Sequence, residues 1–157
     1  GHTVRFASGK ELQAGTLIWS AGVIGAAPEG LPAETIGRGG RLKVNTFNQV
    51  EGLEQVYALG DLALMPTEAY PNGHPMVAPV AIQQASRLAD NLNRLAQKRP
   101  LKPFVYFDKG SMATIGRNRA VVDLGKIRFQ GFFAWFVWMF VHLMSIVGFR
   151  NKMVVFV

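Results

Sequence analysis

Two short apolar runs, residues 16–20 and 56–59, dominate the pattern of the first half of the chain. Each is bounded by a turn signal, and a short apolar run of this kind is typical of a buried parallel strand. The second run leads into Gly60 and Asp61. The pattern therefore predicts two buried strands, with Asp61 just past the carboxyl end of the second, where open α/β sheets bind their ligands.

Weaker signals fill the remainder of the first half. Residues 2–14 alternate apolar and polar positions around a turn at Gly9, which predicts a β-hairpin with a glycine at its tip. Residues 24–40 hold five glycines and two prolines and are expected to form a loop or domain crossover. Residues 41–44 are expected to form a short strand.

The longest periodic segment covers residues 79–97. Pro79 suits the first turn of a helix, because its missing N–H costs nothing there. Apolar residues then recur at steps of three and four, which predicts one apolar stripe along a helix. The stripe consists of Ala81, Ala85, Leu88, Ala89, Leu92, Leu95 and Ala96.

The C-terminal third reads as three strands and an apolar tail. Residues 104–107, 111–115 and 119–124 are β-branched or aromatic runs separated by turn signals, which predicts an antiparallel meander. We expect one face of this meander to pack on the long helix.

Residues 132–149 are apolar except for His142 and Ser145. Their length only reaches the lower limit for a bilayer span, roughly 17 residues. Basic residues at both ends and two closely spaced tryptophans favour a helix lying in the membrane interface. A spanning helix, or burial in a dimer or domain interface, is the alternative. The predicted membrane contacts are Phe132, Phe133, Trp135, Phe136, Trp138 and Met139.

Composition narrows the chemistry. The chain has 157 residues, enough for one domain with a real core, and it has no cysteine. Disulfide frameworks, thiolate nucleophiles and CxxC redox pairs are therefore excluded. The formal net charge is +7, but the basic residues form no single block and no nucleic-acid motif occurs, so nucleic acid is not an expected partner. The three histidines show no metal-ligand spacing, and no metal is assigned.

The turn at residues 60–61 carries the most specific chemistry. Gly60 allows another backbone or a ligand to come close. The Asp61 carboxylate suits sugar or ribityl hydroxyls, which donate hydrogen bonds to a charged acceptor. A purely structural role for Asp61, as the cap of the next turn, is the alternative.

The two apolar runs and the long helix, in this order, resemble the flavoprotein pyridine-nucleotide oxidoreductases with two dinucleotide-binding domains. Residues 104–117 and the aromatic tail are similar to the C-terminal part of type II NADH:quinone oxidoreductases. The resemblance implies an α/β fold, the C-terminal part of a Rossmann-like flavoprotein, with a small antiparallel β meander and an amphipathic C-terminal helix. Its segments would be residues 1–25 (end of the NADH-binding domain), 26–55 (crossover), 56–98 (end of the FAD-binding domain) and 99–157 (meander and membrane-associating helix).

The same resemblance implies FAD as cofactor and NADH as substrate. The cofactor contacts carried over from it are Ala21, Gly22, Gly60, Asp61, Leu62, Val80 and Ala81. Asp61 would hold the flavin ribityl chain, and the helix N-terminus at Val80 and Ala81 would face the flavin ring. The quinone site would be formed by Pro79, Ile82 and Gln83. The family pattern Ala-Gln-x-Ala-x-Gln departs here, because Pro79 replaces its first glutamine.

The implied function is electron transfer from NADH through FAD to a membrane quinone, in a homodimer held on the cytoplasmic face of the bacterial inner membrane by the C-terminal helix. No GxGxxG motif occurs in these residues, so we expect this chain to be part of a longer protein and to be catalytically silent alone. Two alternatives stay open: a non-catalytic membrane-docking and dimerisation module, and a related flavoprotein with a soluble acceptor.

Overall fold

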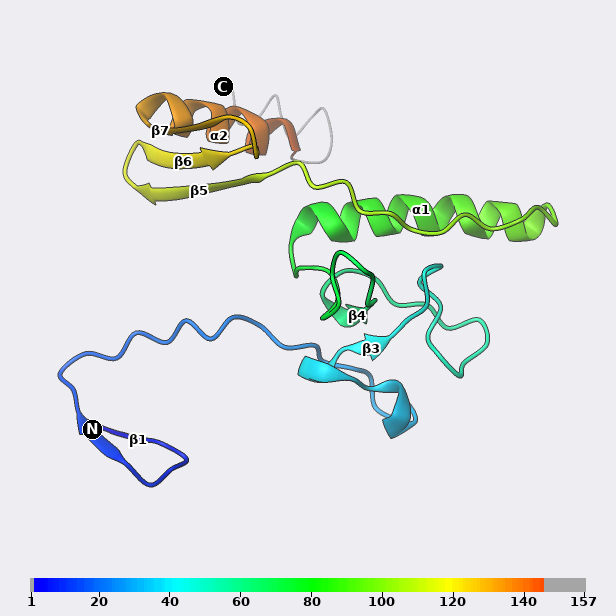
Figure 1. Cartoon of the computed structure of the whole chain (residues 1–157), viewed down its shortest axis with the longest axis horizontal. Coiled ribbons are helices and arrows are strands. Elements are labelled where there is room, and N and C mark those ends of the chain that lie inside the picture. Colours follow the sequence, from blue (N-terminus) through cyan, green and yellow to red (C-terminus); the bar gives the residue numbers. More distant parts are fainter. Residues whose placement is uncertain (1, 146–157) are drawn as a thin grey trace. The chain divides into compact units, whose positions relative to one another are not determined.

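The computed structural model describes residues 2–145 and divides the chain into two compact units, Gly1–Phe104 and Val105–Val157 (Figure 1). The first unit contains, in chain order, the strands and turns β1 (Thr3–Arg5), β2 (Glu11–Gln13), η1 (Ala33–Thr35), η2 (Arg38–Gly40), β3 (Leu42–Lys43), η3 (Gly60–Leu62) and β4 (Ala63–Leu64), and the helix α1 (Ala78–Ala96). The second contains β5 (Ser111–Gly116), β6 (Arg119–Asp123), β7 (Arg128–Gly131) and α2 (Phe132–Ser145). All residues predicted to contact a nucleotide or quinone belong to the first unit.

The N-terminal hairpin is confirmed. Strands β1 and β2 pair antiparallel, with Thr3 opposite Gln13 and Arg5 opposite Glu11. The Arg5 and Glu11 side chains also form an ion pair of 2.6 Å across the hairpin. Gly9 at the tip has φ +82°, a left-handed conformation that favours glycine.

The prediction of a buried strand over residues 16–20 is wrong. These residues belong to no strand in the described part of the chain, and Ile18 and Trp19 are 85% and 81% exposed. A strand requires a neighbouring backbone that completes its hydrogen bonds, and an apolar pattern does not specify where that neighbour comes from. Among residues 2–145 no such neighbour pairs with this segment.

A short parallel pair lies at the centre of the first unit. Strand β3 pairs with β4, with Leu42 opposite Ala63 and Lys43 opposite Leu64, so the expected short strand near residues 41–44 is confirmed. The buried apolar side chains on and around this pair are Leu42, Val44, Val50, Ala58, Ala63, Leu64 and Met65.

The predicted parallel strand over residues 56–59 is also wrong. Tyr57 forms only an isolated antiparallel bridge with Gln49. The Ala58 N–H donates to the Asn48 carbonyl at 3.0 Å, and Asn48 Nδ2 donates back to the Ala58 carbonyl at 3.0 Å. Residues close in sequence therefore take up the backbone hydrogen bonds of this run. The parallel pair of the first unit is instead formed by β3 and β4.

The long helix is confirmed as α1, and Pro79 lies in its first turn. Its buried face differs from the predicted stripe, because it consists of Val80, Gln84, Leu88 and Asn91. Only Leu88 belongs to both sets. Leu92 and Leu95, expected in the stripe, are exposed. Gln84 and Asn91 can be buried because their amides make hydrogen bonds to backbone groups of neighbouring segments.

The second unit contains the predicted antiparallel meander, with strand order β5-β6-β7, but its strands are not the predicted ones. Residues 104–107 form no strand, and the third strand is β7. The turn before β7 is closed by the Asp123 side chain, whose Oδ1 accepts a hydrogen bond from the Gly125 N–H at 2.8 Å. This turn lets the chain reverse after β6, so that β7 can pair with it. The apolar pattern did not reveal the turn, because a side-chain hydrogen bond closes it.

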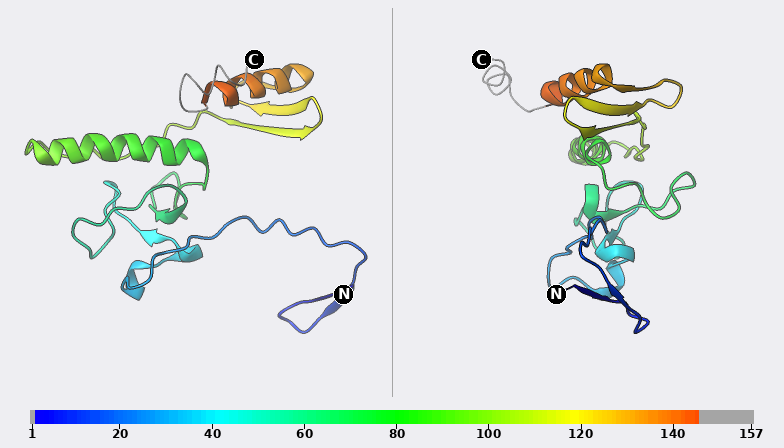
Figure 2. Two further views of the ribbon diagram at one scale, coloured as in Figure 1. Left: turned by 180° about the vertical axis from the view of Figure 1, so that it is seen from behind. Right: turned by 90° about the vertical axis from the view of Figure 1, so that its left-hand side faces the viewer.

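Helix α2 covers one face of this sheet (Figure 2). Ala120 and Val122 of β6 and Ala134 of α2 form its buried centre, with Met112, Phe129, Trp135 and Trp138 packed around them. Within the second unit the helix that packs on the meander is α2; packing of the long helix on the meander stays a prediction. The predicted tail helix begins at Phe132 as expected, and its portion beyond Ser145 lies outside the described residues.

Candidate functional site

The turn at Gly60 touches the first turns of α1. Gly60 has φ +63°, and a Cβ added to it would lie 3.0 Å from the Ala81 Cβ. Both the left-handed backbone and this close approach require glycine. The structure therefore brings together two parts of the predicted cofactor site, the residue 60–62 turn and the beginning of α1.

A hydrogen bond from the helix completes this contact. The Gly60 N–H donates to Gln84 Oε1 at 2.6 Å, and Gln84 is only 1% exposed. The Gln84 Nε2 has no hydrogen-bond partner among the described residues. Sequence reasoning missed Gln84 because its amide interrupts an apolar stripe, although its position four residues after Val80 and four before Leu88 places it on their face.

Arg41 holds the other end of the same turn. This buried guanidinium donates from Nη2 to the carbonyl of Ala63 and, at 3.1 Å, to the carbonyl of His74. Burial lowers the pKa of Arg41, and the charge of Asp61 opposes that change. The pattern of apolar residues gave no reason to select Arg41, since buried arginines cannot be told from solvated ones by periodicity.

His74 lies in an aromatic setting beside Arg41. Its ring centroid is 4.7 Å from that of Tyr70 and 5.3 Å from that of Phe104, with the second pair edge to face. Burial, and then the positive charge of Arg41, lower the pKa of the His74 imidazole. The neutral ring therefore packs as an aromatic side chain near neutral pH.

The remaining predicted residues fall into three groups. Asp61 is exposed and Leu62 half-buried beside the turn, which leaves the carboxylate accessible. On α1, Val80 is buried, Pro79, Ala81 and Gln83 are half-buried, and Ile82 is exposed. Ala21 and Gly22 are exposed, and a Cβ at Gly22 would meet nothing within 4 Å. The described part of the chain thus does not bring Ala21 and Gly22 to the turn.

The start of α1 is open to an anionic ligand atom. Its N-cap is Val77, which offers no side-chain hydrogen bond, and its first turn contains no acidic residue. The positive dipole end of a helix favours negative charge. Pro79 has no N–H, and the Val80 and Ala81 N–H groups donate to the Val77 carbonyl at 3.1 and 3.4 Å, so the dipole is the main attraction here. Together with the accessible Asp61 carboxylate, this gives one acceptor for hydroxyl groups and one site for negative charge beside a glycine turn.

The predicted membrane contacts on α2 divide into two sets. Trp135 and Trp138 are half-buried and pack against the sheet, and Met139 is half-buried as well. Phe132, Phe133 and Phe136 are exposed, as is Phe140. Over residues 2–145 the structure contains no helix long and apolar enough to cross a bilayer.

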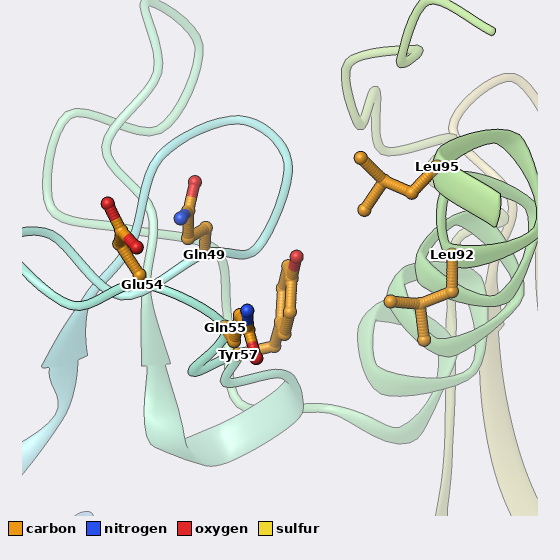
Figure 3. Close-up of a pocket in the computed structure, with 6 residues that line it drawn as sticks. All are labelled: Gln49, Glu54, Gln55, Tyr57, Leu92 and Leu95. Atoms are coloured by element: carbon orange, nitrogen blue, oxygen red, sulfur yellow. The ribbon is translucent and has the colours of Figure 1, made fainter. Parts of the chain in front are cut away.

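One cavity lies elsewhere in the first unit. It has a volume of about 700 Å³ and is lined by Gln49, Glu54, Gln55, Tyr57, Leu92 and Leu95. Figure 3 shows the two leucines of α1 on one side and the polar side chains of the 49–57 loop on the other. None of the predicted site residues lines it. Within the described residues, no group of three or more His, Asp or Glu side chains could hold a metal ion.

Comparison with known proteins identifies the family. Residues 1–85 match the family model of the pyridine nucleotide-disulphide oxidoreductases, which is more than half of the chain. The chain belongs to this family. Residues 109–157 match the NDH2 C-terminal domain, which confirms the resemblance to type II NADH:quinone oxidoreductases.

Individual relatives agree. The type II NADH:quinone oxidoreductase NdhA of Mycobacterium tuberculosis is 37% identical over 164 residues, which cover 97% of this chain and 33% of that protein. The internal alternative NAD(P)H-ubiquinone oxidoreductase A1 of Arabidopsis thaliana is 33% identical over 167 residues, 92% of this chain and 32% of that protein. The chain thus spans about a third of the length of these relatives.

A solved structure shows the same fold. NDH2 from Plasmodium falciparum, in complex with NADH, matches 92% of this chain and 44% of its own chain with a TM-score of 0.72 at 20% identity. This agreement confirms the predicted fold class, the C-terminal part of a Rossmann-like α/β flavoprotein with a small antiparallel sheet.

Proposed function

We propose that this chain is the C-terminal part of a flavoenzyme that passes electrons from NADH through FAD to a quinone. The supporting observation is the contact between the Gly60 turn and the start of α1, with an accessible Asp61 beside it. Two relatives that are 37% and 33% identical over 97% and 92% of this chain are named as NADH:quinone and NAD(P)H-ubiquinone oxidoreductases.

The residues present fit a flavin. The glycine at position 60 lets the turn lie directly against Ala81, which places the accessible Asp61 carboxylate beside the start of α1. Asp61 would accept hydrogen bonds from ribityl hydroxyls, and the start of α1 would stabilise negative charge on the ring. When bound, FAD supplies the two-electron chemistry between NADH and the quinone.

On this proposal the residues of this chain bind and orient the flavin and the quinone. Leu62 and the backbone at Val80 and Ala81 would face the flavin, while Pro79, Ile82 and Gln83 would lie toward the quinone. Ile82 is exposed on α1, which suits contact with an apolar second substrate. Pro79 offers no N–H and no amide side chain, so Gln83 would provide the polar contact that two glutamines share in the family pattern.

The second unit would dock the protein where quinone is dissolved. The exposed phenylalanines of α2 form the apolar surface, and the basic residues that flank the tail would attract anionic lipid. A helix lying in the interface, in a homodimer on the cytoplasmic face of the bacterial inner membrane, is the arrangement we propose.

The decisive experiment uses the longer protein that contains this chain together with the remaining two thirds of the family's length. Its flavin spectrum is recorded, NADH is added anaerobically, and quinone is added afterwards. We expect the flavin band to bleach and then recover, and we expect Asp61→Ala to lose flavin. The 157-residue chain alone should not oxidise NADH with quinone. A protein without flavin would contradict the proposal.

Two other functions give different results in the same experiment. A non-catalytic docking and dimerisation module would keep its membrane binding and assembly while carrying no flavin. A flavoprotein with a soluble acceptor would bleach with NADH but would recover with a water-soluble oxidant, and removal of the tail would not change its rate.

A further inference from the structure

We propose that Arg41 and Gln84 are positioning residues that together fix the residue 60–63 turn against the start of α1. This inference rests on the proposed function, because its consequence is that Asp61 and the helix N-terminus present a single flavin-binding surface. Neither residue is assigned a role by the family resemblance, and neither is expected to touch the flavin.

Gln84 holds the first end of the turn. Its Oε1 accepts the Gly60 N–H at 2.6 Å, so the turn is tied to the second turn of α1 by a hydrogen bond rather than by apolar contact alone. Because Gly60 already lies against Ala81, movement of the helix along its axis would break both contacts. The distance between Asp61 and the helix start is thereby set.

Arg41 holds the second end. One nitrogen, Nη2, donates to the carbonyl of Ala63, which follows the turn, and to the carbonyl of His74, which lies on the loop leading to α1. The Arg41 guanidinium therefore links the residue that follows the turn, Ala63, to the loop that precedes α1. The packing here is close, because a Cβ at Gly73 would lie 3.2 Å from Arg41 Nη1.

Burial of these two groups is costly, which argues for a geometric role. The Arg41 Nε and the Gln84 Nε2 have no hydrogen-bond partner among the described residues, and a buried polar group without a partner destabilises a fold. An apolar residue of similar size would avoid that cost. The polar groups fix the orientation of the turn relative to α1, because a hydrogen bond is directional and apolar packing is not.

The test uses Gln84→Leu and Gln84→Glu, and Arg41→Met and Arg41→Lys, in the longer protein. Glutamate offers an oxygen to Gly60 in either protonation state, and lysine keeps a donor. The matched controls are Asn93→Leu, an exposed amide on α1, and Arg38→Met, an exposed arginine. Two quantities are measured, the hydrogen-exchange rate of the Gly60 amide and the dissociation constant of FAD.

We expect Gln84→Leu to speed Gly60 exchange and to weaken FAD binding, each about tenfold, since leaving a buried donor without a partner costs on this order. Gln84→Glu should recover most of both. Arg41→Met should weaken FAD binding by a similar factor, with partial recovery in Arg41→Lys. The two controls should match the wild type.

Unchanged FAD binding in both Gln84→Leu and Arg41→Met would overturn the inference. If either variant fails to fold, Gln84→Asn decides, because its shorter amide keeps the polarity and withdraws the acceptor, and wild-type exchange and FAD binding in it would also overturn the inference. A wild-type protein that carries no flavin would contradict the proposed function, and Gly60 exchange would then decide alone whether these residues hold the turn.

Discussion

Asn91 and Lys102 exchange two hydrogen bonds: Asn91 Nδ2 donates to the Lys102 carbonyl, and the Lys102 N–H donates to Asn91 Oδ1, both at 2.9 Å. The Asn91 side chain on α1 thus satisfies the backbone N–H and carbonyl of Lys102, as a neighbouring strand would do in a sheet. We expect Asn91→Ala to lower the free energy of unfolding by about 1–3 kcal/mol, the cost of two lost hydrogen bonds in a buried setting. Urea denaturation measures this loss. Asn93→Ala, on the exposed side of α1, should change it by less than about 0.5 kcal/mol; equal losses in both variants would contradict the assignment.

Two features require glycine at position 60, its left-handed backbone and its close contact with Ala81, and their costs can be measured separately. Gly60→Ala should cost about 1–2 kcal/mol for the left-handed backbone and more for the contact with Ala81. Gly52 has φ +79° and open space around a Cβ, so Gly52→Ala reports the backbone cost alone. The excess in Gly60→Ala should fall when Ala81→Gly is added, which a double-mutant cycle measures. No coupling between the two sites would show that the turn and α1 are not in contact.

The packing of His74 predicts a dependence of stability on pH. Burial and the charge of Arg41 lower the pKa of His74 below 6.5. The unfolded chain therefore binds this proton at a higher pH than the folded chain, and stability should be full above about pH 6.5 and fall as the pH drops through that value. His74→Phe should remove this slope between pH 7.5 and 5.5. His2→Gln, in the exposed hairpin, is the control, and a slope that survives His74→Phe would disprove the assignment.

Asp123 predicts a second loss of stability in the same direction, at lower pH. The Gly125 N–H, and then Arg128, lower the pKa of the Asp123 carboxyl below 3.8, and Arg128 Nε lies 2.9 Å from Asp123 Oδ2. The contribution of this carboxylate to stability is present above about pH 3.8 and is lost as the pH falls through its folded pKa. The protection of the Gly125 amide, which is its intrinsic exchange rate divided by its observed rate at each pH, should therefore fall in a step as the carboxylate is protonated. Asp123→Asn keeps an acceptor oxygen but does not titrate, so its exchange should show no such step.

How much of this structure could be predicted depends on how local each feature is. The helix α1 and the β1–β2 hairpin were predicted because periodicity and turn residues act over a few positions. Gln84 was missed because its partner, Gly60, lies 24 residues away, and a polar residue on an apolar face is uninformative until that partner is known. Residues 16–20 were assigned wrongly for the same reason, since pairing is decided by a distant backbone.

In the candidate site, too, the local features could be predicted and the contacts between distant residues could not. The turn at residues 60–61 was recognisable from its glycine and carboxylate, and the helix start from Pro79. Their contact was expected only through the family resemblance, and the residues that enforce it were not expected at all. Arg41 reads as an ordinary basic residue, because its hydrogen bonds go to backbone carbonyls that any sequence would offer.

Helix α2 provides the last prediction. Its exposed phenylalanines Phe133, Phe136 and Phe140 follow steps of three and four and so share one face, whereas Trp135 packs on the sheet. We expect Phe136→Asp with Phe140→Asp to weaken binding to phosphatidylglycerol-containing vesicles by more than tenfold, because removing one buried aromatic from an apolar phase costs about 1.5–3 kcal/mol.

Two matched variants separate membrane contact from stability. Ile127→Asp replaces an exposed apolar residue in the turn before β7, and it should bind vesicles like the wild type. Trp135→Ala should instead lower the melting temperature, because it removes packing against Ala120 and Val122. Vesicle flotation and thermal denaturation measure the two effects. Unchanged vesicle binding in the double phenylalanine variant would exclude this face of α2 as the docking surface.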